Sequence, residues 1–305
     1  MKRFLLNILI FAGAIVAPLL LIDVGLGKNP DSAVNEWPVK YELLKDTPQP
    51  RIIFIGGSSH TMGLDSHRIE DSLHVNVVNA ALGGATGLKY LTEGPAQYFK
   101  DGDIIVNCME YNSFSGDRYW GGGDDDLFLM VNRSFEDIKL LDEKQKKSYV
   151  SGYFINIRNR LQEIGKEISP YAVYNKHSFN DRGDKTLHWG YPSKYSGAPS
   201  LINKPLNVEA VKHFANTIHE LRKTKTVILL PGNCGRTYFK DNEGYIRQCI
   251  AALEAEGISL QCDPLQHVQD DDCVFDFPMH FNKKGVDLNT AEVIRDLKAL
   301  MPPKE

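Results

Sequence analysis

Two short polar clusters in this 305-residue chain hold the side-chain types of nucleophilic catalysis. The first is GGSSH at residues 56–60, where two serines follow a glycine turn. The second is DFPMH near the C-terminus, in which three residues separate Asp276 from His280. A serine hydroxyl becomes a nucleophile when a histidine takes its proton and a carboxylate orients that histidine. Together the clusters indicate acyl transfer, whereas a phosphate-binding turn or a simple helix cap is the alternative interpretation of the serines.

The surrounding segments predict the elements that must position these residues. Residues 51–55 are an apolar run typical of a buried strand, and residues 64–73 are an amphipathic helix. The alternation of strand and helix continues through 74–79, 87–99 and 103–109, and then returns through 210–222, 226–230, 242–256, 258–262 and 283–300. This alternation predicts an α/β fold with a parallel sheet.

Polar turns follow three consecutive strands of this predicted sheet. After the serine turn come the small residues 79–86 and then the polar residues 110–114. Because parallel strands end at a shared edge where ligands bind, we expect these turns to form one site. Each turn taken separately is also compatible with ordinary turn chemistry.

On these residues the chain resembles the SGNH (GDSL-like) superfamily of hydrolases and acyltransferases. FIGGSSHT is similar to the first block of the family, with Ser58 replacing the usual aspartate and Ser59 in the nucleophile position. Ser58 is the alternative nucleophile, because both serines lie on the turn. Residues 79–84 are similar to the second block, which implies that the Gly84 N–H donates to the oxyanion.

The resemblance is weaker in the third and fifth blocks. Asn112 is the nearest match to the side-chain oxyanion donor of the third block, with Glu110 as the other candidate. The fifth block of the family is Asp-x-x-His, so the resemblance implies His280 as the base and Asp276 as its partner across one extra residue. If that residue does not bulge out, the partner comes from the nearby run Asp270, Asp271 and Asp272.

The resemblance covers residues 51–112 and 226–300 and implies a three-layer α/β/α, flavodoxin-like sandwich spanning residues 50–301. Residues 115–205 do not match and are expected to form an inserted, mostly helical or irregular subdomain that acts as a lid or recognises substrate. Some aromatic residues of this insertion can either stack on sugar rings or pack onto the core, namely Tyr119, Trp120, Trp189 and Tyr191.

The N-terminus predicts a membrane anchor within residues 1–27. A basic start is followed by about twenty residues with little polarity, enough to cross a hydrocarbon core, and residues 28–49 follow as a polar tether. The basic flank predicts a single-pass protein whose catalytic domain is extracytoplasmic, in the periplasm or at the cell surface. A cleaved signal peptide and a buried helix are the alternatives.

Composition narrows the classes of partner. The net charge of -4 and the lack of a basic cluster argue against nucleic acid. No metal or organic cofactor is expected, because the run at residues 124–126 is more typical of a solvated turn than of a metal site. The five cysteines fit an exported domain with one or two disulfides, with Cys262 and Cys273 as the guessed pair and Cys108 as a buried free thiol.

The serine turn, the anchor and the HFNKKG ending resemble the membrane-anchored branch of the superfamily. That resemblance implies work beside a membrane-bound O-acyltransferase and transfer of acetyl or D-alanyl groups to cell-surface polysaccharide or teichoic acid. We therefore expect an extracytoplasmic serine-dependent O-acyltransferase. The first alternative is a carbohydrate esterase or deacetylase that acts on an acylated polysaccharide, and the second is an inactive SGNH-like protein of polysaccharide binding or assembly.

Overall fold

A parallel four-stranded sheet forms the centre of the protein, with strand order β2-β1-β3-β4. The computed structural model describes residues 2–25, 36–131, 135–163, 173–174 and 176–301. The strands are β1 Arg51–Gly56, β2 Asn76–Asn79, β3 Ile104–Met109 and β4 Thr226–Pro231. β1 pairs with both β2 and β3, so Ile53 lies opposite Val78 on one side and Ile105 on the other. The serine turn therefore leaves the middle of the sheet.

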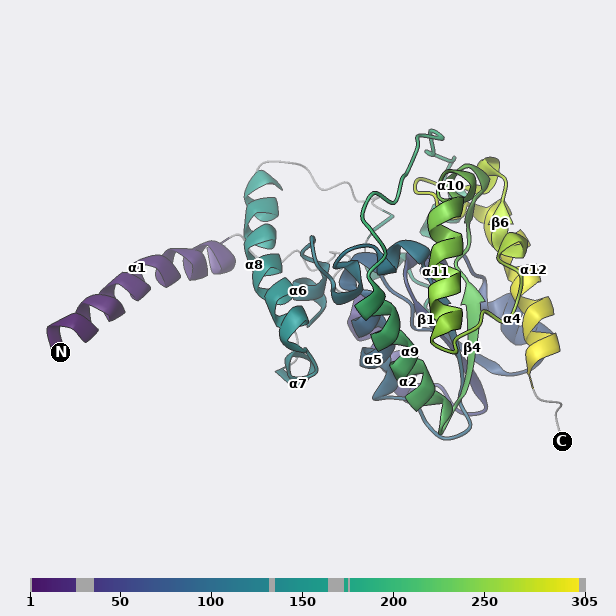
Figure 1. The fold of residues 1–305 in the computed structure, drawn as a ribbon, viewed down its shortest axis with the longest axis horizontal. Coiled ribbons are helices and arrows are strands. Elements are labelled where there is room, and N and C mark those ends of the chain that lie inside the picture. The colour runs from purple at the N-terminus through teal and green to yellow at the C-terminus, as the bar shows by residue number, and fades with distance from the viewer. Residues whose placement is uncertain (1, 26–35, 132–134, 164–172, 175, 302–305) are drawn as a thin grey trace.

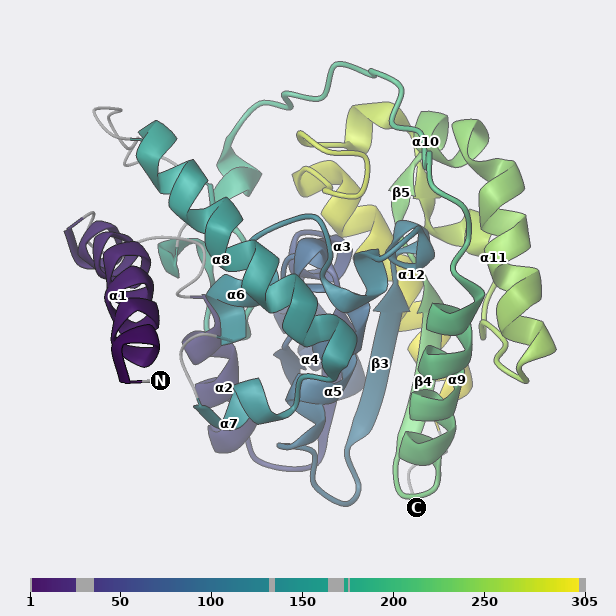
Figure 2. The same cartoon turned by 60° about the vertical axis from the view of Figure 1, so that its left-hand side comes forward.

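Successive residues of β1 belong to two different apolar clusters, because a strand points its side chains to alternate faces. Ile53 and Ile55 pack with one set of helices, and Ile52 and Phe54 pack with the other. The first set is α2 Glu36–Asp46, α5 Leu88–Ala96, α9 Val208–Arg222 and α11 Glu243–Ala255; the second is α4 Ser66–Leu73 and α12 Lys283–Leu300. Figures 1 and 2 show the sheet between these helices, which confirms the predicted α/β fold with a central parallel sheet.

Helix α12 fixes the C-terminal polar cluster against the sheet. Asn282 is its N-cap, and the Asn282 side chain accepts a hydrogen bond of 3.1 Å from the Gly285 N–H. A cap of this kind contributes about 1 kcal/mol to helix stability. Val293 and Leu297 of the same helix are buried in the cluster that contains Phe54 of β1. The loop that ends at Asn282 is thus held beside the strand that carries the serines.

The strand predicted for residues 258–262 is wrong. This segment runs beside β4, where the Gln261 N–H donates to the Leu229 carbonyl oxygen at 3.1 Å. The Leu229 N–H donates in turn to the side-chain Oε1 of Gln261 at 2.7 Å. Because a side chain accepts where a ladder would use a backbone carbonyl, no regular pairing develops. The short strands β5 Cys234–Gly235 and β6 Val268–Gln269 pair parallel nearby.

The region between the two halves of the sheet contributes helices that pack on α2 and α5. Its helices are α6 Asp126–Val131, α7 Phe135–Lys139 and α8 Glu143–Glu163. Leu127 and Val131 share an apolar cluster with Trp37 of α2 and Leu91 of α5. Tyr119 and Trp120 are 0% and 2% exposed in the main core, so these two aromatics pack the fold and cannot stack on a sugar.

Short helical turns complete the fold. Two of them are α-helical, and the others are 3-10 turns at strand ends and in loops. They are α3 Ser58–Thr61, α10 Arg236–Asp241, η2 Gly84–Thr86, η3 Tyr111–Phe114, η4 Arg118–Trp120, η5 Lys176–Ser178, η6 Leu187–Gly190, η7 Pro264–His267 and η8 Asp271–Cys273.

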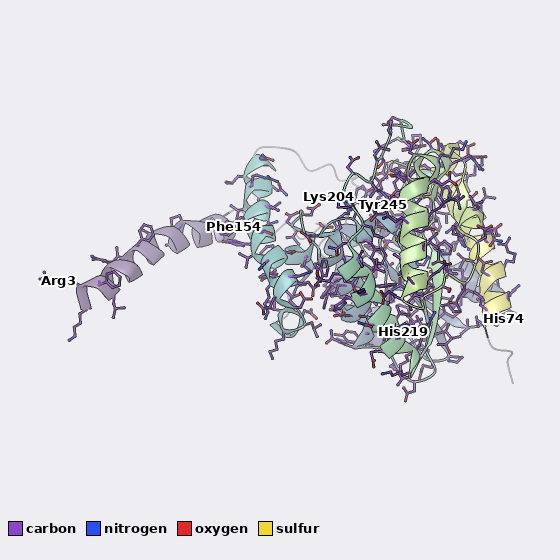
Figure 3. All side chains as sticks on the ribbon, in the orientation of Figure 1. Arg3, His74, Phe154, Lys204, His219 and Tyr245 are labelled. Atoms are coloured by element: carbon purple, nitrogen blue, oxygen red, sulfur yellow. The ribbon has the colours of Figure 1, made fainter. Side chains whose placement is uncertain are left out.

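Helix α1, Lys2–Gly25, extends away from the sheet, and Arg3 lies near its outer end (Figure 3). Several of its large apolar side chains are more than half exposed, namely Phe4, Leu5, Leu6, Ile10 and Phe11. Over the residues described, no helix combines the length and the apolar character needed to cross a bilayer. The anchor at residues 1–27 stays a prediction of the sequence, and residues 26–27 lie outside the described part.

All five cysteines are free thiols in the structure, so the predicted disulfide between Cys262 and Cys273 is wrong. The Cys262 Sγ lies 3.5 Å from His267 Nε2, and the Cys273 Sγ lies 3.4 Å from an oxygen of Asp272. Cys108 is fully buried in β3, as the apolar run around it predicts. Burial raises the pKa of the Cys108 thiol to about 12, which keeps this thiol neutral.

Candidate active site

The two glycines before the serines are required by close packing at the end of β1. Gly56 has a φ of +129°, and a Cβ at this position would collide with the backbone carbonyl of Cys108 in β3. A Cβ on Gly57 would collide with the Glu110 carboxylate. The backbone clash and the positive φ require glycine at position 56, and at position 57 a side chain would displace the Glu110 carboxylate; the chain turns sharply here and begins α3 at Ser58.

The adjacent serines face different surroundings. Ser58 is partly exposed, and its Oγ lies 2.8 Å from Nε2 of His280. Ser59 is 0% exposed, and its Oγ lies 3.5 Å from the Sγ of Cys108 inside the sheet. Consecutive helical residues point about 100° apart, so only one of the two hydroxyls can face the histidine. The predicted pairing of Ser59 with His280 is wrong, and Ser58, the alternative serine, takes that place.

The C-terminal loop folds back so that its aspartate reaches its histidine. The Phe275 N–H donates to the His280 carbonyl oxygen at 2.7 Å, and the His280 N–H donates to the Phe277 carbonyl oxygen at 2.8 Å. This closed turn absorbs the extra residue and places Asp276 Oδ1 2.9 Å from His280 Nδ1. The predicted partnership of Asp276 and His280 is present in the structure.

The three aspartates that the sequence offered as alternative partners of His280 form hydrogen bonds with other residues. Their partners are an arginine and a threonine of α10 and a lysine of α12. The three pairs are Asp270 with Arg236, Asp271 with Thr237 and Asp272 with Lys284.

Tyr174 contacts both Asp276 and His280, although nothing in the sequence predicts that it belongs to the site. It comes from the unmatched insertion, and its hydroxyl donates to Asp276 Oδ2 at 2.6 Å and lies 3.1 Å from His280 Nδ1. Burial opposes ionisation of Asp276, but the hydrogen bonds from His280 and Tyr174 outweigh it and hold the pKa of the carboxyl below its usual value. The carboxylate is therefore ionised at neutral pH and can orient the imidazole.

The third polar turn brings Glu110, rather than Asn112, to the serines. Glu110 Oε1 accepts hydrogen bonds from the Ser59 N–H at 2.9 Å and from the Ser58 hydroxyl at 3.3 Å. Asn112 is 9% exposed in η3, and its Oδ1 has no hydrogen-bond partner among the described residues. Glu110, the second candidate at this strand end, is thus the one that bonds to the serine turn, and the role of Asn112 as side-chain oxyanion donor stays a prediction.

Gly84 does lie at the same edge, as predicted. A Cβ on Gly84 would collide with Oε2 of Glu110, so the second and third turns meet at this carboxylate. The turn is anchored by Asn79, whose Nδ2 donates to Asp184 Oδ1 at 2.8 Å and to the His60 carbonyl oxygen at 3.0 Å. Burial raises the pKa of Asp184, which is 0% exposed. Asp184, which belongs to the insertion, therefore holds Asn79 at the start of the second turn.

Two groups outside this edge have side-chain atoms close enough to consider as metal ligands. Cys262, His267 and Asp296 form one group, and residues 124–126 form the other. In the first group, the histidine Nε2 already lies 3.0 Å from the Asp296 Oδ2, which is a direct hydrogen bond. In the second, the Asp125 Oδ2 accepts from Asn156 at 3.1 Å. The Asp126 carboxylate of the second group lies beside Gly83 of the second turn.

Ser58, His280 and Asp276 are connected in the order that a nucleophile, a general base and an orienting carboxylate require. The Ser58 Oγ is within hydrogen-bond distance of His280 Nε2, and the opposite ring nitrogen meets Asp276. Such a series of contacts can transfer the hydroxyl proton to the imidazole as the oxygen attacks a carbonyl carbon.

Comparison of the sequence with models of protein families, with curated proteins and with solved structures gave no match.

Proposed function

We propose that this protein is a serine-dependent acyl-transfer enzyme with Ser58 as nucleophile, His280 as general base and Asp276 as the carboxylate that orients it. The observation that carries the proposal is the continuous contact from Ser58 Oγ through both nitrogens of His280 to Asp276, at 2.8 Å and 2.9 Å. Ser58 is separated from His280 by 222 positions in the sequence, and the two meet at the carboxyl edge of the sheet, where α/β enzymes bind ligands.

The proposed reaction has two balanced steps. Ser58 Oγ attacks the carbonyl carbon of an ester or thioester, its proton passes to His280 Nε2, and the leaving alkoxide or thiolate takes that proton as its bond to the acyl carbon breaks. An acceptor hydroxyl then attacks the acyl carbon and gives its proton to His280; as the bond between that carbon and Ser58 Oγ breaks, His280 returns the proton to the serine oxygen. A sugar hydroxyl as acceptor makes the protein a transferase, and water makes it an esterase.

The expected acceptor is an extracytoplasmic polysaccharide. This part of the proposal rests on the resemblance to membrane-anchored SGNH acyltransferases and on the apolar N-terminal sequence, which together imply a membrane-bound partner that supplies the acyl group. Fold and triad geometry are shared by transferases and esterases. Adding an acetylated oligosaccharide, with and without an acceptor sugar, separates them: a transferase forms acylated sugar faster than it releases acetate.

A non-catalytic role is favoured by one observation, the Glu110 carboxylate against the serine turn. An anion 3.3 Å from the attacking oxygen opposes the negative charge that develops during acyl transfer. A binding or assembly protein with this fold would keep the serine contacts and show no acyl-serine.

Covalent labelling of the full chain with a fluorophosphonate probe tests the proposal. We expect the label on Ser58, located by mass spectrometry of the peptide that holds both serines. Ser58→Ala should abolish labelling, whereas the matched variant Ser59→Ala should keep most of it, because the hydroxyl that this change removes contacts Cys108 and not His280. Label on Ser59 would refute the assignment of the nucleophile, and absence of any label, together with no ester hydrolysis, would favour the binding role.

A further inference from the structure

The Glu110 carboxylate accepts the backbone N–H of Ser59, the residue next to the proposed nucleophile. We propose that Glu110 is a built-in plug that holds the active site closed until an incoming acyl group displaces its carboxylate. The inference rests on the proposed acyl transfer and concerns how that same site is regulated. It is carried by the contacts of one buried side chain.

The carboxylate of Glu110 is enclosed by the glycines and serines of two turns. Its Oε1 accepts hydrogen bonds from the Ser59 N–H at 2.9 Å and from the Ser58 hydroxyl at 3.3 Å. Cβ atoms on Gly57 or Gly84 would each collide with its oxygens. These contacts define a cradle, formed by Gly57, Ser58, Ser59 and Gly84, which now holds a carboxylate oxygen beside the proposed nucleophile.

The buried Glu110 carboxylate is compensated by hydrogen bonds from the Ser59 N–H and the Ser58 hydroxyl. The residue is 3% exposed, and among the described residues no lysine, arginine or histidine forms an ion pair with it. A buried carboxylate without a cation is costly to the folded state, and an apolar or amide side chain would fill the space at lower cost. A costly group kept at a reactive centre is better explained by function than by packing.

The position of Glu110 has a direct chemical consequence. When Ser58 attacks, the carbonyl oxygen of the acyl group needs N–H donors close to the attacked carbon, and the Ser59 N–H is directed at Glu110 instead. The carboxylate and the carbonyl oxygen cannot share one position. The Glu110 charge, 3.3 Å from the Ser58 Oγ, also opposes the charge that the reaction develops. The resting site is therefore protected against water and adventitious esters.

Emptying the cradle should raise the reactivity of Ser58. We would compare fluorophosphonate labelling rates of the full-length wild type, Glu110→Ala and Glu110→Gln, with Glu93→Ala as the control for losing a carboxylate remote from the serines. We expect Glu110→Ala to label about tenfold faster than wild type, because loss of one oxyanion contact in other enzymes costs 10²–10³ in rate. Glu110→Gln should fall between them, because it keeps the bulk and loses the charge.

A second measurement tests the cradle without any reaction. Sodium acetate supplies a free carboxylate, so acetate should raise the melting temperature of Glu110→Ala and protect its Ser58 from the probe, with sodium chloride at equal ionic strength as the reference. Wild type and Glu93→Ala should show neither effect, because their cradle is filled.

The outcomes separate this inference from the proposed function. Faster labelling and acetate stabilisation of Glu110→Ala support the plug. Acetate stabilisation without labelling of any variant shows that Glu110 fills an anion-binding cradle, but it overturns acyl transfer and with it the role of Glu110 in closing that reaction. Folded Glu110→Ala that labels no faster than wild type overturns the plug, as does absence of an acetate effect. Should Glu110→Ala not fold, Glu110→Gln decides alone: labelling at or below the wild-type rate overturns the plug.

Discussion

Two histidine–aspartate pairs in this protein have hydrogen bonds of similar length but lie in different surroundings. His280 and Asp276 are joined at 2.9 Å, and His267 and Asp296 at 3.0 Å. The side chains of the first pair are 10% and 22% exposed, and those of the second pair are 2% and 7% exposed. The first pair lies at the carboxyl edge of the sheet, whereas the second lies between η7 and α12.

The decisive difference is what the other ring nitrogen faces. His267 Nδ1 lies 3.0 Å from the Oδ1 of Asn289, whose amide is itself fixed by donation to the Gly63 carbonyl oxygen at 2.9 Å. His280 instead directs its second nitrogen at the Ser58 hydroxyl. A histidine with both nitrogens committed to a closed network stabilises the fold, and one that faces a hydroxyl can move a proton. A His-Asp contact alone therefore does not identify an active site.

The largest expected effect is on the rate, and it should separate the two histidines. We expect His280→Gln to lower the rate at which a fluorophosphonate labels Ser58 by about 10³-fold or more, because loss of the base leaves the serine hydroxyl unactivated. The matched variant His267→Gln should label at close to the wild-type rate when assayed below its melting temperature. Time courses of fluorophosphonate labelling, quenched at set times, measure the labelling rates of both variants. Equal losses of labelling rate in the two variants would contradict the assignment of different roles to His280 and His267.

The next effect is on stability, and it should fall on the other pair. Asp296→Asn removes the charge from a buried hydrogen-bonded pair, and we expect it to lower the free energy of unfolding by about 3 kcal/mol. Asp276→Asn, at a more exposed pair, should cost about 1 kcal/mol. Urea unfolding at pH 7 measures both. A larger loss for Asp276→Asn than for Asp296→Asn would contradict the assignment of the structural role to the inner pair.

Acid should reveal the buried neutral histidines beside the site. Burial lowers the pKa of His60 to about 3 and that of His188 to about 4, against an ordinary value of 6.5. The unfolded chain therefore binds more protons between pH 6.5 and pH 4, so stability is present above pH 6.5 and is lost as the pH falls. The loss should be about 1.4 kcal/mol per pH unit for each histidine.

Variants assign that acid dependence. His60→Phe, which keeps a ring against Phe54, should reduce the slope of unfolding free energy against pH by about half. The control is His219→Asn, an exposed position on α9 (Figure 3), which should leave the slope unchanged. Urea unfolding at pH 7, 6 and 5 supplies the slopes. An unchanged slope in His60→Phe would show that this histidine is not held neutral.

The smallest effect should come from Tyr174→Phe. This change removes the hydroxyl that donates to Asp276 Oδ2, so the pKa of Asp276 should move up toward its usual value while His280 keeps its hydrogen bond. Loss of one such bond is worth about 1 kcal/mol, so labelling of Ser58 should slow by about fivefold. A readout specific to positioning is the pH profile of labelling, whose acidic limb should shift upward. An unshifted profile would leave Tyr174 with packing alone.

The sequence predicted the parts of the site that depend on local patterns. The glycine turn after β1 follows from an apolar run that meets a second strand and leaves no room for Cβ atoms at Gly56 and Gly57. The Asp-His loop was predicted from its place before α12, and helix and strand positions followed the apolar periodicity. The strand at residues 258–262 was predicted from the same periodicity and failed, because the Gln261 side chain replaces a ladder bond.

Tertiary structure alone decided which groups meet. Either serine satisfies the pattern on the turn, and only the direction of α3 against the sheet sends Ser59 toward Cys108 and Ser58 toward His280. Glu110, which the sequence offered as the second candidate of the third turn, arrives from a strand end. Tyr174 arrives from the insertion, and nothing in its local sequence marks it. Periodicity and glycine demands are properties of neighbouring residues, so the sequence by itself determined the scaffold. Contacts between distant residues depend on how the layers pack, so the membership of the site was settled by the fold.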